Sequence, residues 1–97
     1  MSVKTNLKDD IDILLPKLYK VIILNDDYTT FDFVINILKS IFNKTEEEAI
    51  NLTLKIDREG SAVVGVYPYE IAITKVHYVH DIARKAGFPL RARIEEE

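Results

Sequence analysis

Three consecutive polar residues, Asn25, Asp26 and Asp27, follow an apolar run and are the side chains best placed to bind a charged group. Two adjacent carboxylates and an amide can bind a cation, position a water molecule, or cap a following helix. No further carboxylate follows at the alternating spacing of a calcium loop. Neighbouring side chains of an extended segment also point apart, which argues against an acid–base pair. All three roles stay open at this point.

His77 and His80 lie three residues apart and share one face of a predicted helix. Two imidazoles alone rarely form a metal site, so a surface or partner-facing role is favoured. The chain has no cysteine, which excludes disulfides and thiolate chemistry. Its three glycines, at 60, 65 and 87, form no phosphate loop. An enzyme is therefore the weaker class of function, and we expect no cofactor and no metal at the histidines.

Composition indicates one small domain that folds on its own. The chain has 97 residues, of which 47% are hydrophobic and 30% charged. Thirteen Lys and Arg against sixteen Asp and Glu give a net charge of −3, which argues against nucleic-acid binding. Apolar runs stay far below the roughly 20 residues of a membrane span, and the polar start does not resemble a signal peptide. The expected location is the cytoplasm.

The hydrophobic pattern predicts three strands and three helices in the order strand, helix, helix, strand, helix, strand. The predicted ranges are 18–24, 31–42, 45–58, 61–67, 69–86 and 89–94. Thr45 and Glu48 form a capping box, and Gly60 and Gly87 are expected to end the second and third helices. Such a set predicts an α+β domain of two layers. Residues 1–16 are predicted to be a flexible N-terminal extension and residues 17–97 the core domain.

Apolar spacing also predicts which helix residues face the core. The first helix carries the stripe Phe31, Val34, Ile35, Leu38, Ile41 and Phe42. The third helix is expected to turn inward Ala72, Val76, Val79, Ile82 and Ala83.

Several separated motifs together resemble the ClpS adaptor family. Residues 21–30 read VIILNDDYTT and, with Asp32, Phe33 and Val34, resemble the opening signature of that family. The segments 60–67, 70–76 and 88–90 resemble its second strand, third helix and last turn. The resemblance extends over residues 17–96 without a gap.

The resemblance implies an adaptor and not an enzyme. Such an adaptor binds an N-terminal Leu, Phe, Tyr or Trp of a substrate, the signal called an N-degron, and delivers the substrate to a ClpA- or ClpC-type AAA+ unfoldase paired with ClpP. It implies a three-stranded antiparallel sheet with three helices (β-α-α-β-α-β), similar to the C-terminal domain of ribosomal protein L7/L12. We also expect a monomer with no nucleic-acid or membrane partner.

The resemblance further assigns roles to residues of this chain. Asn25 and Asp26 would accept hydrogen bonds from the substrate α-ammonium, and Asp27 and Thr29 would shape the rim. The wall of the apolar pocket would come from Phe31, Val34, Thr53, Ile56 and Leu90. Tyr67, Glu70 and Lys75 match positions that contact the N-terminal domain of the unfoldase.

The chain departs from the family pattern in its second helix and at the pocket entrance. Asp57 stands where the family usually has a His that helps to hold the substrate amine. It either serves the same ammonium or lies on the helix surface, with N-degron recognition altered or lost. Phe31 and Thr53 stand where Met is common, so the accepted side chains are expected to differ. Two other classes stay open: a nucleic-acid-associated domain of similar fold, and a metal-dependent hydrolase that uses Asp26, Asp27 and a His.

Overall fold

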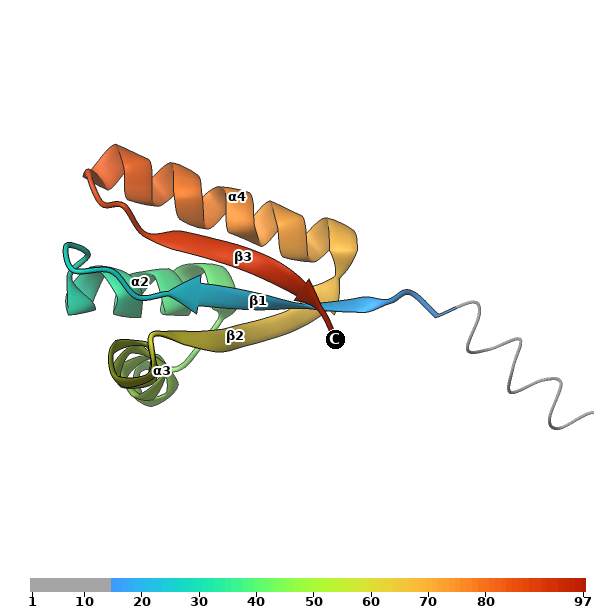
Figure 1. The fold of residues 1–97 in the computed structure, drawn as a ribbon, viewed down its shortest axis with the longest axis horizontal. Coiled ribbons are helices and arrows are strands. Elements are labelled where there is room, and N and C mark those ends of the chain that lie inside the picture. The colour runs from blue at the N-terminus through green and yellow to red at the C-terminus, as the bar shows by residue number, and fades with distance from the viewer. Residues whose placement is uncertain (1–14) are drawn as a thin grey trace, which may run out of the picture.

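Strand β1 (Leu18–Leu24) is the middle strand of a three-stranded sheet. The structure is a computed structural model that describes residues 15–97. Strands β2 (Ser61–Pro68) and β3 (Arg91–Glu96) both pair antiparallel to β1, in the order β2-β1-β3 (Figure 1). Val21 and Ile23 of β1 are fully buried. The predicted antiparallel sheet is confirmed.

Three helices complete the described part of the chain: α2 (Phe31–Phe42), α3 (Glu46–Glu59) and α4 (Tyr69–Ala86). Figure 1 shows α4 beside β3 and α3 beside the start of β2. The element order is β-α-α-β-α-β, so the predicted α+β fold class is confirmed. No helix among residues 15–97 is long and apolar enough to cross a membrane. The predicted extension lies outside the described residues, except for its last two positions.

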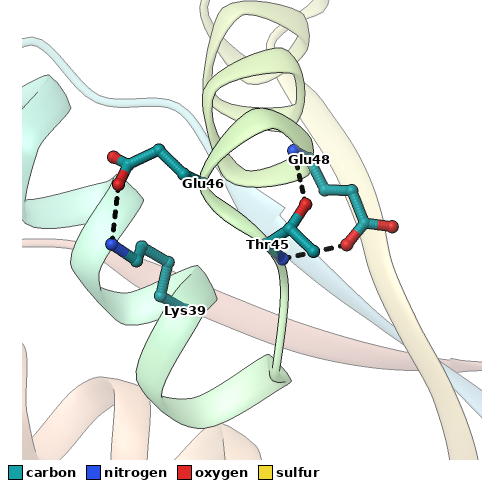
Figure 2. Close-up of polar contacts among 4 residues, drawn as sticks. All are labelled: Lys39, Thr45, Glu46 and Glu48. Carbon is teal, nitrogen blue, oxygen red and sulfur yellow. Dashed lines mark hydrogen bonds and ion pairs between the residues drawn. The ribbon is translucent and has the colours of Figure 1, made fainter.

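Local capping fixes the turn between α2 and α3. The Thr45 hydroxyl accepts from the Glu48 amide at 3.2 Å, and the Glu48 carboxylate accepts from the Thr45 amide at 2.9 Å (Figure 2). Lys39 of α2 pairs with Glu46 of α3 at 2.9 Å. Gly60 then ends α3 with φ of +89°, a conformation that favours glycine. The predicted capping box and the stop at Gly60 are confirmed.

One face of the sheet packs against the helices. α4 contributes Ala72, Val76, Val79 and Ala83, but Ile82 is 41% exposed, so its predicted inward position is wrong. The four buried residues form one seam along α4, and Ile82 lies to one side of that seam. In α2, Ile37 is buried although the predicted stripe omitted it, and Phe31 is 45% exposed.

Strand β3 begins two residues later than predicted. Arg91 pairs with Leu24 and Glu96 pairs with Tyr19, so the ladder covers 91–96 instead of 89–94. Pro89 has no amide hydrogen to give to a ladder. Leu90 is buried against the site described below, outside the ladder.

A β-bulge interrupts the pairing of β1 with β2. Ile22 lies opposite Val63 and Val21 lies opposite Gly65, so Val64 is an extra residue. A Cβ atom at Gly65 would overlap the Tyr67 ring, which covers this position. Because of the bulge, Val63 and Val66 both lie on the face of the sheet away from the helices, and they are 42% and 40% exposed.

Candidate functional site

A cavity of about 260 Å³ lies at the end of β1, between the first turn of α2, the middle of α3 and the residue before β3. Its lining residues are Leu24, Asn25, Asp26, Asp27, Thr29, Phe31, Val34, Thr53, Ile56, Asp57 and Leu90. All ten residues predicted for amine binding, pocket wall and rim lie on this one cavity. Leu24 is the lining residue that the prediction missed.

Burial divides the cavity into an apolar interior and a polar mouth. The wall residues Val34, Thr53, Ile56 and Leu90 are at most 6% exposed. Asn25, Asp27 and Asp57 are exposed at the mouth, and Asp26 and Thr29 are half-buried. A ligand that fits both parts has an apolar side chain next to a polar, positively charged group.

Asp26 fixes the shape of the loop between β1 and α2. Its Oδ1 accepts from the amides of Tyr28 at 2.8 Å and Thr29 at 2.7 Å, and its Oδ2 accepts from the Thr29 hydroxyl at 2.7 Å. Burial acts to raise the pKa of Asp26, but these three hydrogen bonds outweigh it and hold the pKa below its ordinary value. Asp26 is therefore ionised at neutral pH and already oriented.

The rest of the loop excludes one of the roles left open for the Asn-Asp-Asp segment. The N-cap of α2 is Thr30, whose hydroxyl accepts from the Phe33 amide at 3.2 Å, so helix capping by this segment is wrong. The backbone amide of Asn25 donates to the Gly60 carbonyl at 2.8 Å and ties the loop to the start of β2. No group of three His, Cys, Asp or Glu residues suited to a metal is found within 15–97.

Helix α3 presents Thr53, Ile56 and Asp57 to the cavity, because residues three and four apart share a helix face. The Thr53 hydroxyl donates to the Ala49 carbonyl at 2.7 Å, so its proton is used within the helix. Asp57 lies one turn after Thr53, at the mouth. The cavity lining thus carries three carboxylates and no cation.

The predicted docking residues lie away from the cavity, where β2 meets α4. Lys75 donates to the Ile41 carbonyl at 2.6 Å, and its ammonium lies 5.1 Å from the Tyr67 ring centre and 5.7 Å from that of Phe42. Burial raises the pKa of Tyr67. Glu70 is exposed in the first turn of α4. Lys75 therefore holds the end of α2 against α4, a contact that the sequence did not reveal.

His80 has a fixed structural partner. Its Nε2 accepts from the Ala92 amide at 3.0 Å, which joins α4 to the outer edge of β3. Burial and the positive charge of Arg91 lower the pKa of His80, in keeping with a neutral ring. The expected surface or partner-facing role is wrong for His80, whereas His77 is exposed.

Comparison with known proteins identifies relatives of one family. A family model described as ATP-dependent Clp protease adaptor protein ClpS matches residues 15–93. The ATP-dependent Clp protease adapter protein ClpS of Nautilia profundicola is 67% identical over 96 residues, 99% of each chain. That of Wolinella succinogenes is 50% identical over 93 residues, 96% of this chain and 91% of the relative.

A solved structure has a similar three-dimensional fold. The structure of Agrobacterium tumefaciens ClpS2 bound to L-phenylalaninamide superposes with a TM-score of 0.83 at 44% identity, and the match covers 86% of this chain and all of that chain. The family model matches most of the chain, and the relatives match nearly all of it. The chain therefore belongs to the ClpS family, whose members are adaptors of the ATP-dependent Clp protease and not enzymes.

Proposed function

We propose that the cavity binds the N-terminal residue of substrate proteins, with Leu, Phe, Tyr or Trp in the apolar interior and the free α-ammonium at the mouth. The observation that carries this proposal is one cavity with an apolar wall and a carboxylate mouth. L-phenylalaninamide, the ligand of the related Agrobacterium structure, has a free amine beside an aromatic side chain. That pairing is the chemistry of a protein N-terminus.

The expected free energies support specific binding of an N-terminal residue. Burying a Leu or Phe side chain contributes roughly 1.5–3 kcal/mol, and charge-assisted hydrogen bonds to the ammonium contribute about 1.5–3 kcal/mol. Asn25 and Asp26 are the proposed acceptors, and Asp27 and Thr29 shape the rim around them. Acetylation of the substrate removes the positive charge and leaves desolvated acceptors without a donor.

Peptides with free and acetylated N-termini test this proposal. Fluorescence anisotropy with peptides that begin with Leu, Phe, Ile or Met should show binding of the free Leu and Phe peptides and loss of binding upon acetylation. A peptide of the same composition with Leu at an internal position is the matched control. Absence of binding by every free-amine peptide would reject N-degron recognition and favour an interaction module with another ligand.

Asp57 is proposed to serve the substrate ammonium in place of the usual His. Asp57→Ala should weaken binding of a Leu-initiated peptide because it removes an anionic acceptor from the mouth. Asp57→His should preserve or improve the affinity. Glu59→Ala is the control, since Glu59 lies nearby on α3, is exposed and does not line the cavity. If Asp57→Ala leaves the affinity unchanged, Asp57 is a surface residue without a part in recognition.

Delivery to a ClpA- or ClpC-type unfoldase with ClpP completes the proposal, with Tyr67, Glu70 and Lys75 as the docking face. Residues 17–97 form the proposed core domain and residues 1–16 an extension that engages the unfoldase. We expect a cytoplasmic monomer. Tyr67 and Lys75 contact each other, and Glu70 lies five residues, about 1.4 helix turns, before Lys75 on α4.

Of the two charged docking residues, Glu70 can be replaced with less effect on the fold. Its side chain is exposed, and its hydrogen bond with Thr74 uses only the backbone carbonyl. Glu70→Ala should slow degradation of a Leu-initiated substrate by the unfoldase and ClpP, with peptide affinity and unfolding free energy unchanged. Lys75→Ala should slow delivery as well, but it should also lower the unfolding free energy because it breaks the contact with Ile41.

Glu47→Ala, an exposed carboxylate on α3, is the control for this delivery assay. If the substrate is degraded at the same rate with Glu70→Ala as with the unchanged chain, Glu70 is not part of the docking face. Peptide affinity, measured in parallel, separates a docking defect from a recognition defect.

A further inference from the structure

The face of the sheet away from the helices carries an apolar strip flanked by cations. Cross-strand partners lie on the same face, so the register groups Ile22 with Val63 and Arg93, and Lys20 with Val66 and Glu95. Leu18 is 41% exposed at the start of β1 and lies diagonal to Val66, whereas Val63 lies further along the sheet, opposite Ile22. Arg91, two residues before Arg93, lies on the same face. The face therefore combines an apolar half on β1 and β2 with Arg91 and Arg93 on β3, where Arg93 also pairs with Glu95 at 2.8 Å.

The segment that precedes β1 has the complementary composition. Residues 9–15 read DDIDILL, with three acidic residues, four apolar residues and no cation. In an extended chain Ile11, Ile13 and Leu15 share one side. The order of residues also suits this face. Ile13 and Leu15 are closest in sequence to β1, and the acidic residues lie nearer the N-terminus.

We propose that residues 9–15 of the same chain dock on this face of the sheet. Only Pro16 and Lys17 separate the segment from Leu18, and Leu15 is 61% exposed. Lys17 pairs with Glu96 at 3.3 Å, so the segment leaves the sheet beside the end of β3. Docking requires a turn at Pro16 and Lys17, which form no turn in the structure, and the segment then runs back over β1, antiparallel to it.

The lengths agree with this path. Seven extended residues span about 23 Å, the length of the seven-residue strand β1. In this path Leu15 and Ile13 cover Val66 and Val63, and Asp10 and Asp12 lie near Arg91 and Arg93. A tether this short gives an effective concentration on the order of millimolar, so a weak contact suffices for docking.

A spin label tests the docking in the full chain. Because the chain has no cysteine, Lys8→Cys gives a single attachment point next to Asp9. With the nitroxide active, the amide NMR signals of Val63, Val66 and Arg93 should lose most of their intensity. The signals of Lys39 and Thr74, on the helix side, should keep most of theirs. Equal losses on both sides would overturn the proposal.

Two variants show whether the proposed contacts cause the effect. Ile11→Ser with Ile13→Ser removes apolar side chains from the segment and should abolish the selective loss. Val66→Lys places a cation in the apolar strip at an exposed position and should do the same. A selective loss that survives both variants would contradict docking through these residues.

A mixing experiment identifies the occupant. Spin-labelled protein without isotopes is mixed with isotope-labelled protein without the spin label. Docking within one chain predicts no loss at Val63 and Val66 in this mixture. Loss of these signals in the mixture would show that the segment binds a second copy. If the spin-labelled chain measured alone also shows no signal loss, the face is available to another partner. Either result overturns the proposal, and neither depends on peptide binding.

Discussion

Asp26→Asn is expected to weaken binding of Leu- and Phe-initiated peptides by about 1.5–3 kcal/mol, roughly tenfold to a hundredfold or more. The substitution removes the negative charge proposed to face the ammonium. It keeps an amide oxygen that can still accept from the Tyr28 and Thr29 backbone, so the loop retains most of its support. Asp26→Ala should cost at least as much, because it removes the loop contacts as well. Fluorescence anisotropy or calorimetry measures both.

The control for Asp26→Asn is Asp32→Asn. Asp32 is an exposed carboxylate in the first turn of α2 that does not line the cavity, so the net charge changes equally. Its variant should bind peptides almost as the unchanged chain does. If peptide affinity falls by the same factor in both variants, the effect comes from the net charge of the protein, and Asp26 does not contact the amine directly.

Leu38→Ala is expected to lower the free energy of unfolding by about 2–5 kcal/mol. Leu38 is fully buried in the middle of α2, and its backbone carbonyl accepts from the cap residues Asn43 and Lys44. A loss of this size is a large part of the 5–15 kcal/mol that is typical for a small domain. Chemical denaturation followed by circular dichroism measures it.

Ile71→Ala removes the same number of carbon atoms from a position on α4 that is 48% exposed. It should lower the unfolding free energy by less than about 1 kcal/mol. Leu38 does not line the cavity, so peptide affinity of the folded Leu38→Ala protein should stay close to that of the unchanged chain. Similar losses for the two variants would show that α2 is not seated on the core as described.

Features with local causes were predictable from the sequence. The capping box at Thr45 and the left-handed end of α3 at Gly60 depend on residues close in the chain, and both are found. The residues of the cavity were predicted from a family resemblance, and the structure brings them together. Their roles in recognition stay predictions.

Features that depend on distant contacts were not predictable. The Lys75 ammonium meets the Ile41 carbonyl 34 positions away, and the His80 ring accepts from Ala92 across a chain reversal. Neither partner is visible in a periodic pattern. The exposure of Ile82 depends on which seam of α4 faces the sheet, and hydrophobicity alone did not separate it from Ala83.

Helix α2 sets the distance between the two proposed binding surfaces. Its first turn carries Phe31 and Val34 to the cavity, and its last turn offers the Ile41 carbonyl to Lys75. Twelve helical residues span about 18 Å. If the proposed docking face is correct, the unfoldase contact at Lys75 and the substrate at the mouth lie at opposite ends of this one helix.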